Sequence, residues 1–426
     1  MKKLIGKLSQ SKAALLAMGV PAGVVPAVAA TADATVSVQE NAQQSLNIVG
    51  ACMINPTTLE ILYSNGTRMS MDFYGENIFR IFQDNQGGII RDPQATPEAQ
   101  ILVDNPRKAV SQIELKDQNG VITVQTKDVK IELDKKTTLF KVTSLKTGKV
   151  VAESVAPVQF EKGRVTVSLK EQNKEYFYGG GVQNGRFSHK GQEIEIVNTN
   201  NWTDGGVASP TPFYWSTEGY GIMWHTFKPG KYDFGAAEKG KVVLQHDEDY
   251  LDMFLMVNNT PVALLNDFYQ LTGNPVLLPK FGFYEGHLNA YNRDYWKEDP
   301  KGVLYEDGKK YVESQTDNGG TKESLNGEKN NYQFSARAVI DRYNAHDMPL
   351  GWVLPNDGYG AGYGQTETLD GNIQNLKEFG DYARSKGVEI GLWTQSDLHP
   401  KEGISALLQR DIVKEVRDAG VRVLKT

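Results

Sequence analysis

Hydrophobic and polar residues alternate with a period of two along much of residues 47–279, as they do in half-buried β-strands. Val129 and Ile131, for example, are separated by a lysine. Asn-Gly, Thr-Gly and Pro-Gly pairs recur at short intervals, and the first amphipathic helical pattern is at Pro261–Gly273. Many short strands joined by such turns predict a large β-sandwich, which we place at residues 46–278.

The pattern changes after Pro279, where apolar runs of strand length alternate with segments whose apolar residues recur at helical spacing. A polar stretch at Asn289–Asn331 has little periodicity, and loops of that length are usually functional or mobile. The predicted elements are a strand at Phe281–Glu285, a helix at Ala336–Tyr343, a strand at Leu350–Leu354, a helix at Ile373–Ala383 closed by Gly387, a strand at Val388–Trp393, a helix at Ile404–Val416 closed by Gly420, and a strand at Val421–Leu424.

Repeated strand–loop–helix units with polar residues on the strand-to-helix side are typical of a (β/α) barrel. Residues 279–426 therefore predict the first half of a (β/α)8 TIM barrel, with four parallel strands in the order 1-2-3-4 and helices outside. A doubly wound open sheet is the alternative, although no Gly-x-Gly-x-x-Gly motif opens any of these helices. Half a barrel would leave strand edges unpaired, so we expect the natural protein to be longer.

Composition and charge exclude several partners and kinds of site. A length of 426 residues exceeds one ordinary domain, and a net charge of −6 argues against nucleic acid or an anionic membrane as partner. Cys52 is the sole cysteine, which excludes an intrachain disulfide and a zinc site built on several thiolates. The six histidines are scattered, without a His-x-x-x-His pair. We predict no metal and no cofactor.

The first 30 residues have the pattern of a secretory signal peptide. Lysines precede an apolar stretch of small residues, and Ala27-Val28-Ala29 fits a small-x-small cleavage site. A membrane anchor is the alternative, but two prolines, a glycine and the modest length weaken it. We expect residues 31–45 to be a flexible leader, the protein to be secreted or at the cell surface of a bacterium, and no membrane span to remain after cleavage.

The segment Leu350–Gly364 combines a buried strand with a loop that holds Asp357, Tyr359, Tyr363 and four glycines. A carboxylate accepts hydrogen bonds from hydroxyls, aromatic rings cover apolar sugar faces, and glycines allow close backbone approach. The loop therefore predicts a sugar site, and an ordinary turn rich in Gly and Asn is the alternative.

Two stretches of the sandwich also carry unusual residues. Tyr176–Gly191 contains three consecutive glycines, but no Gly-Lys-Ser/Thr follows, so a sharp turn explains them better than a phosphate loop. Asn198–Phe213 contains Trp202 and Asp204 in a polar loop. That loop is either surface decoration or a segment that reaches into the neighbouring domain's site.

Taken together, these pieces resemble glycoside hydrolase family 31 over most of residues 47–426. The order and spacing of the pieces are more specific than any one of them. The motifs that carry the resemblance are Tyr178-Gly179-Gly180-Gly181, His189-Lys190-Gly191, Pro212-Phe213-Tyr214-Trp215 with Gly219-Tyr220-Gly221, Phe281-Gly282-Phe283 and, most specifically, Val423-Leu424-Lys425-Thr426.

Two departures from common α-glucosidases and α-xylosidases of the family point to one branch. The second strand ends in Pro355–Gly360 rather than an Asp-aliphatic-Asp-Tyr run, and the third ends in Leu392–Asp397 rather than an aliphatic-Pro pattern. These endings resemble the α-N-acetylgalactosaminidase branch, whose secreted members act on mucin-type glycans.

The resemblance implies a mutarotase-like sandwich, a TIM barrel and a retaining α-glycosidase, which needs two carboxyl groups about 5–5.5 Å apart. It places the nucleophilic aspartate immediately after Thr426 and the acid/base on a later strand, so no catalytic residue is expected in this chain. Asp357 is expected to accept hydrogen bonds from the 4- and 6-hydroxyls, and Asp204 matches a loop that the family inserts into its pocket.

Four further residues complete the expectation. Trp393 either covers a sugar face or caps the barrel core. His287 and Tyr359 are further substrate-binding residues, although a lone histidine after a strand is more often structural. Asp397 caps the next helix or faces the site.

Other functions remain open. An α-glucosidase or α-xylosidase of the same family is one, and a non-catalytic carbohydrate-binding protein with a lectin-like sandwich is another. An acid immediately after Thr426 favours the enzyme, and its absence favours the binding protein.

Overall fold

The computed structural model describes residues 46–96, 98–288, 294–328, 331–356, 370–393 and 412–425. The predicted signal peptide and leader lie outside these ranges, as do Asp357, Tyr359 and Asp397. No helix in the described ranges is long and apolar enough to span a membrane.

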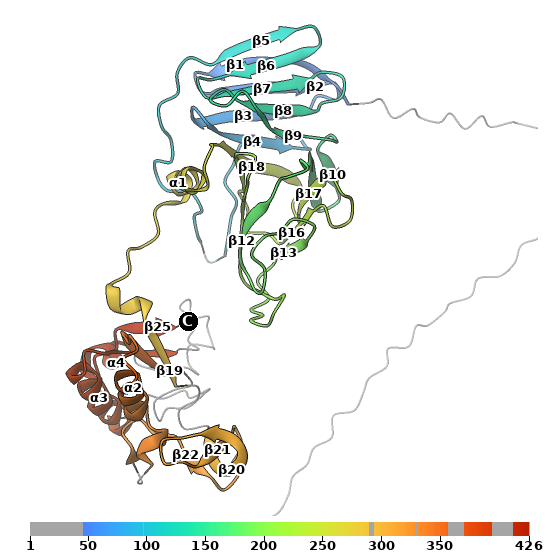
Figure 1. Ribbon diagram of the computed structural model, residues 1–426. Helices are drawn as coiled ribbons and strands as arrows, with labels where there is room; N and C mark the ends of the chain where they lie inside the picture. The colour runs from blue at the N-terminus through green and yellow to red at the C-terminus, as the bar shows by residue number, and fades with distance from the viewer. Residues whose placement is uncertain are drawn as a thin grey trace, which may run out of the picture. The chain divides into compact units, whose positions relative to one another are not determined.

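The largest sheet of the described chain is antiparallel, and Figure 1 shows it in the N-terminal part of the molecule. Its strands, in spatial order, are β1 (Ile48–Asn55), β2 (Thr58–Tyr63), β3 (Arg68–Gly75), β4 (Ile78–Asp84), β18 (Tyr250–Val257), β15 (Tyr220–Trp224), β14 (Val207–Ser216) and β12 (Phe177–Gln183).

Two smaller antiparallel sheets pack against the inner face of this sheet. One contains β5 (Glu114–Gln118), β6 (Val121–Gln125), β7 (Val129–Asp134), β8 (Phe140–Ser144) and β9 (Val150–Glu153) in sequential order. The other contains, in spatial order, β10 (Gln159–Glu161), β11 (Arg164–Lys170), β17 (Lys241–His246), β16 (Gly230–Phe234) and β13 (Glu193–Ile196).

The predicted sandwich is confirmed by the core that the three sheets share. Met71 of the large sheet, Ile131 of β7 and Leu244 of β17 are all buried in one apolar cluster. The alternation read from the sequence is the cause, because every second residue of these strands faces the cluster. Asn119 and Gly120 join β5 to β6 with positive φ at both positions, as a two-residue hairpin turn requires.

Helix α1 (Pro261–Thr272) covers part of the outer face of the large sheet. The Thr260 hydroxyl caps its first turn by accepting a hydrogen bond from the Ala263 amide, and Pro261 fits the first helical turn. Leu264 packs in a second apolar cluster together with Phe254 of β18. This helix lies where the sequence predicted it.

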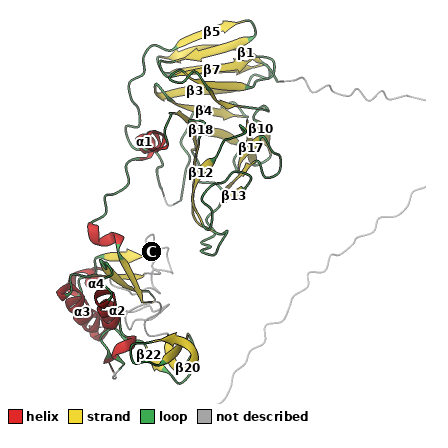
Figure 2. Ribbon diagram, viewed as in Figure 1, coloured by secondary structure: helices red, strands yellow, loops and turns green. Residues whose placement is uncertain are grey.

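The C-terminal part contains four parallel strands in sequential order: β19 (Glu285–Leu288), β23 (Trp352–Pro355), β24 (Glu389–Trp393) and β25 (Val423–Lys425). Helices α2 (Ala336–Ala345), α3 (Asp370–Ser385) and α4 (Ile412–Asp418) lie between them in the chain and gather on one face of the sheet (Figure 2). The expected parallel order is therefore confirmed.

One apolar cluster joins these helices to the strands. Ile340 of α2, together with Leu376 and Phe379 of α3, packs against Val353 and Ile390 of the sheet. All five side chains are fully buried. After α3, Gly387 adopts a φ of +77°, which a glycine tolerates, and its amide donates to the Arg384 carbonyl as the chain leaves the helix.

The first of the four strands does not lie where the sequence predicted it. Lys280–Phe283 forms a 3₁₀ turn, and the Phe283 side chain is 63% exposed rather than buried. Pairing with β23 begins at Tyr284, whose carbonyl accepts from the Gly351 and Trp352 amides. The prediction of a buried strand at Phe281–Glu285 was wrong because aromatic residues suit a strand and a turn that starts the sheet equally well.

The polar stretch Asn289–Asn331 is also more ordered than predicted. It contains the three-stranded antiparallel sheet β21 (Lys310–Ser314), β20 (Tyr295–Leu304) and β22 (Thr321–Lys322), followed by the 3₁₀ turn η3 (Tyr332–Phe334). The Trp296 ring stacks on Phe334 with centroids 5.4 Å apart. Tyr305 and Tyr311 pack edge-on against Phe334, so aromatic contacts replace an apolar periodicity.

Candidate functional site

The carboxyl ends of β19, β23, β24 and β25 lie together at one edge of the parallel sheet. Asn356, the first residue after β23, donates its backbone amide to the Leu288 carbonyl at the end of β19, over 3.0 Å. Its side-chain Oδ1 accepts from Nζ of Lys425 at 2.8 Å. Lys425 pairs in register with Trp393. This edge therefore brings together the ends of all four strands, as parallel pairing requires.

Asp357, the principal residue predicted from the sequence, directly follows Asn356 but lies outside the described residues, and so does Tyr359. The structure describes Asn356, the residue that precedes Asp357 in the chain. Asn356 is held by a backbone hydrogen bond on one side and by an ammonium group on the other. Their roles in sugar binding stay predictions.

The two faces of the sheet have different surroundings. Val353 and Ile390 face the helices and are fully buried. His287 and Trp393 lie on the opposite face, because successive side chains of a strand alternate and their neighbours Leu288 and Leu392 are in the helix-facing cluster. The sheet thus brings these two predicted residues to one face.

His287 and Trp393 on this second face are less buried than Val353 and Ile390. Trp393 is half-buried, which fits both a ring that covers a sugar and one that packs in a core. The His287 ring is 41% exposed and its Nδ1 lies 3.4 Å from a carboxylate oxygen of Glu285. Gly391 of β24 lies beneath the Trp352 indole of β23. A Cβ on Gly391 would lie 2.5 Å from that ring, so the indole fills the space that a side chain would need.

A cavity of about 200 Å³ adjoins His287 and was not predicted. Trp296, Glu323 and Arg342 line it together with Gln333. Sequence reasoning missed these residues because Trp296 and Glu323 belong to the stretch that has no periodicity. A tryptophan and isolated acidic residues within that stretch were the available signal.

Glu323 is the most perturbed carboxyl group of this cavity. Its side chain is 5% exposed, and Oε1 accepts a hydrogen bond of 3.0 Å from Nε1 of Trp296. The other oxygen, Oε2, makes no hydrogen bond within the described ranges. Burial, opposed by the Trp296 hydrogen bond and assisted by the nearby Asp294, raises the pKa of Glu323 to about 8. Glu323 therefore holds a proton at neutral pH.

One group of carboxylates in the described ranges has the spacing of metal ligands. Oxygen atoms of Asp294, Glu313 and Glu323 all lie within 4.8 Å of one another. Acidic groups at such spacing are common without an ion, and a carboxyl group that carries a proton is a poor ligand. The expectation that the protein needs no metal stays a prediction.

Asp204 lies in the sandwich, in the turn between β13 and β14. It is exposed, and its carboxylate lies against Gly185, where a Cβ would approach Oδ1 to 1.5 Å. The Gly205 amide donates to the Asn184 carbonyl, and Asn184 Nδ2 donates to the Asn201 carbonyl. The turn is therefore fastened to the end of β12, which holds Asp204 at a fixed, solvent-facing position.

The three glycines that precede this region have a structural explanation. Gly179, Gly180 and Gly181 all have positive φ, and the pairing of β12 with β14 shifts register between Gly179 and Gly181. A Cβ on Gly181 would lie 2.1 Å from the Ser209 carbonyl oxygen. The motif is a bulge where two backbones approach closely, not a phosphate loop.

Comparison with known proteins connects this architecture to a family. Residues 68–233 match the glycosyl hydrolase 31 N-terminal galactose mutarotase-like domain. This match supports an assignment of the chain to glycoside hydrolase family 31. The α-xylosidase XylQ of Lactiplantibacillus pentosus is 25% identical over 202 residues, which cover 44% of this chain and 25% of that protein. An α-xylosidase of Emericella nidulans is 28% identical over 133 residues, which cover 30% of this chain and 17% of that protein.

The solved structure of a glycoside hydrolase family 31 dextranase from Flavobacterium johnsoniae, in complex with isomaltotriose, superposes with a TM-score of 0.63. The match covers 82% of this chain and 38% of the dextranase, at 13% identity. At that identity the likeness concerns the fold. The two curated relatives are matched over a quarter of their length or less, so the activity of the whole protein is a matter for proposal.

Proposed function

We propose that the whole protein is a retaining α-glycosidase of glycoside hydrolase family 31. One observation carries the proposal: the segment that matches the family's N-terminal domain is followed, in the same chain, by four sequentially ordered parallel strands. The family's catalytic carboxyls belong to such a sheet, and in (β/α) barrels active sites lie at the carboxyl ends of the strands. We place the boundary between the two domains at residue 278 and complete the sheet as a (β/α)8 barrel.

In this proposal β25 leads directly into the nucleophile. The residue after Thr426 is an aspartate that attacks the anomeric carbon, and a later strand supplies the acid that protonates the leaving oxygen. The second carboxyl then activates the water that hydrolyses the glycosyl-enzyme, which retains the configuration. The residues of this chain bind and orient the sugar rather than react with it.

The substrate proposed is a terminal α-linked N-acetylgalactosamine of a mucin-type glycan. This sugar has an axial 4-hydroxyl and a bulky 2-acetamido group, and both need space beside the ring. The loop after β23 has four glycines at positions 358–364, where side chains would otherwise fill that space. Asp357 anchors the 4- and 6-hydroxyls, Trp393 covers a sugar face, and Tyr359, His287 and Asp204 are further contacts.

An α-xyloside is the alternative substrate, and a separate observation favours it. Both curated relatives described above are α-xylosidases. Xylose lacks the 6-hydroxymethyl group and the acetamido group, so a xylosidase pocket would be smaller. The two substrates are separated by measuring kcat/KM on the nitrophenyl α-glycosides of N-acetylgalactosamine, xylose, glucose and galactose.

The experiment uses the protein expressed from the complete gene. Hydrolysis of nitrophenyl α-N-acetylgalactosaminide at the highest kcat/KM supports the full proposal, whereas a clear preference for xyloside or glucoside refutes the N-acetylgalactosamine assignment and leaves the family. No hydrolysis of any α-glycoside refutes the enzyme and favours a carbohydrate-binding protein. Proton NMR of the first product shows whether the α-configuration is retained.

Substitutions in the whole protein test the roles of the proposed sugar-binding residues. Asp357→Asn should lose most of kcat/KM, because a site built to pair hydroxyls loses a charge-assisted hydrogen bond of about 1.5–3 kcal/mol. Trp393→Ala should loosen the sugar preference instead. Glu298→Gln, on the exposed strand β20, is the control and should match the wild type. Residues 1–426 alone should hydrolyse none of the four substrates.

Export is part of the same proposal. We propose that residues 1–30 are removed during secretion from a bacterium. Sequencing the N-terminus of protein recovered from the culture medium tests this. A mature N-terminus near residue 31 supports it, and full-length protein retained in the cytoplasm contradicts it.

A further inference from the structure

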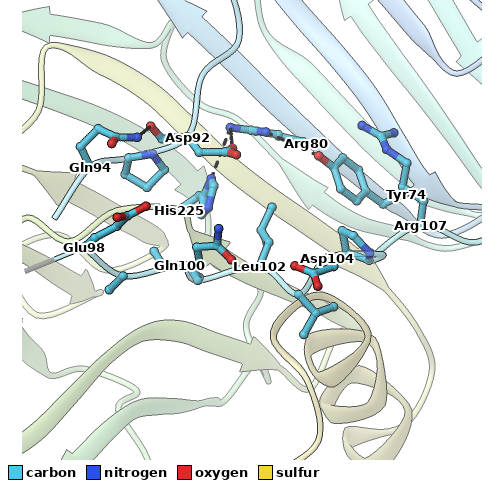
Figure 3. A pocket seen from close by; sticks show the side chains of 15 residues that line it. Tyr74, Arg80, Asp92, Gln94, Glu98, Gln100, Leu102, Asp104, Arg107 and His225 are labelled. Atoms are coloured by element: carbon cyan, nitrogen blue, oxygen red, sulfur yellow. Dashed lines mark hydrogen bonds and ion pairs between the residues drawn. The ribbon is translucent and has the colours of Figure 1, made fainter.

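The sandwich contains a cavity of about 440 Å³ that the proposed hydrolysis does not use (Figure 3). Its floor is formed by side chains on the outer face of the large sheet, and its walls by residues 92–94 and 98–107, which belong to the connection from β4 to β5. This volume is within the range of about 300–1,000 Å³ that is typical of small-molecule sites. Neither His287 nor Trp393 lines it.

Three fully buried charged or polar side chains form a network at the floor. Arg80 of β4 is 3% exposed, Asp252 of β18 is 1% exposed, and His225, just after β15, is 1% exposed. Nε and Nη2 of Arg80 donate to the two carboxylate oxygens of Asp252, each over 2.7 Å. His225 Nδ1 lies 2.9 Å from Oδ2 of the same aspartate. Each of the two Asp252 oxygens is therefore occupied.

This network determines which nitrogen of His225 is free to bind a ligand. Nη2 of Arg80 has two protons, which it donates to Oδ2 of Asp252, to the Arg91 carbonyl at 2.8 Å and to Oδ1 of Asp92 at 3.2 Å. It has no proton left for Nδ1, so Nδ1 carries a proton and donates it to Asp252. Nε2 is the ring nitrogen that remains for a ligand, because Nδ1 faces Asp252.

His225 lines the cavity, and Figure 3 shows its ring among the other lining side chains, next to Arg80. The hydrogen bond between Nδ1 and Asp252 fixes the position of the ring. The floor thus presents a ring nitrogen, Nε2, at a defined position.

The walls are fastened to the sandwich rather than loosely placed. The Val103 amide donates to the Leu271 carbonyl at the end of α1, over 2.9 Å. Gln270 Nε2 donates to the Pro106 carbonyl at 2.9 Å. Arg107 donates to the buried Asp72, with Nη2 and Oδ2 2.5 Å apart. These contacts keep the cavity open in a defined shape, which lowers the entropic cost of binding.

The chemistry of the rim indicates the class of ligand. Gln94 and Gln100 offer amides that both donate and accept, Glu98 and Asp104 offer acceptors, and Leu102 adds apolar surface. Because both arginines that line the cavity are paired with aspartates, the remaining acidic groups disfavour an anion. Asp92, Glu98 and Asp104 are not among the carboxylates close enough to share a cation in the described chain.

We propose that this cavity is a second carbohydrate-binding site, which holds one neutral monosaccharide unit with a hydroxyl hydrogen-bonded to Nε2 of His225. Hydroxyl groups both donate and accept, so they match amides, carboxylates and an imidazole nitrogen at once. The proposal does not depend on hydrolytic activity, since none of the lining residues belongs to the parallel sheet. It gives the sandwich a binding role of its own.

Isothermal titration and saturation-transfer NMR on the 426-residue chain test this with D-galactose, D-glucose, D-xylose and N-acetyl-D-galactosamine as probes. At least one sugar should bind. Gln100→Ala, an exposed rim change, should weaken it at least tenfold, and His225→Phe should abolish it. Gln118→Ala, a matched exposed glutamine on β5, should bind as the wild type does.

Two results would overturn the proposal. Binding that is unaffected by Gln100→Ala places the sugar elsewhere and overturns the proposal. Absence of binding by all four sugars also overturns it. Since His225 is buried, His225→Phe counts only if its melting temperature stays close to that of the wild type, and Gln100→Ala decides the question otherwise. If the protein from the complete gene hydrolyses no α-glycoside while the 426-residue chain still binds a sugar here, the enzyme is refuted but this site is not.

Discussion

Replacing Glu323 with glutamine should remove a pH-dependent loss of stability from the three-stranded sheet next to His287. The unfolded chain releases the Glu323 proton near the ordinary pKa of 4.5, whereas burial raises the pKa of the folded protein to about 8. Between these values the folded state binds a proton that the unfolded state has lost. Stability contributed by this group is therefore complete below pH 4.5 and falls as the pH rises to 8.

The magnitude follows from the shift. One pKa unit corresponds to about 1.4 kcal/mol, so the loss between pH 5 and pH 8 should be about 3 kcal/mol. Glutamine keeps an oxygen that accepts from Nε1 of Trp296 and cannot ionise. The variant should equal the wild type near pH 5 and be more stable by about 2–3 kcal/mol at pH 8.

Amide hydrogen exchange of β20 and β21 measures this locally. The wild type and Glu323→Gln are compared at the same pH, at pH 5 and pH 8, so that the intrinsic exchange rate cancels. Glu298→Gln is the matched control, since Glu298 lies on the same sheet, is 59% exposed and pairs with Lys309. A difference between Glu323→Gln and the wild type that is the same at both pH values would refute the reasoning.

Three further predictions concern stability and can be measured by thermal or denaturant unfolding. Gly181→Ala should destabilise the sandwich by about 1–3 kcal/mol, because φ is +79° and a Cβ would collide with the Ser209 carbonyl; an unchanged melting temperature would show that the bulge can relax. Asp252→Ala should cost about 3–5 kcal/mol by removing the buried carboxylate that pairs with Arg80 and leaving only the exposed Asp92, and a loss below 1 kcal/mol would mean that Asp92 or water compensates the guanidinium. Phe379→Ala should cost about 3–5 kcal/mol in the core between α3 and the parallel sheet, and unfolding at the wild-type denaturant midpoint would contradict that core.

The local pattern of apolar residues predicted several of the strands and helices. The alternation at Val129 and Ile131 predicted β7, and the helical spacing of Ile373, Leu376 and Phe379 predicted α3. Gly387 marked the end of that helix. These predictions succeeded because a strand or helix that buries one face must repeat apolar residues with its own geometric period.

The tertiary structure alone decided where the first parallel strand begins and whether the stretch after Leu288 folds. Phe281 and Phe283 suit a strand by propensity, but pairing with β23 starts only at Tyr284. Trp296 finds its stacking partner in Phe334, far along the chain. Neither outcome has a local period, so a pattern search could not find it.

The buried network of the sandwich shows the same limit most clearly. Arg80 and Asp252 are separated by 172 positions, and Arg80 and His225 by 145. They meet because β4 pairs with β18 and β18 with β15, an order that no local stretch encodes. The sequence by itself determined those strands and helices whose apolar residues repeat with a local period. Only the tertiary structure decided which polar groups share a buried site, because that depends on long-range strand pairing.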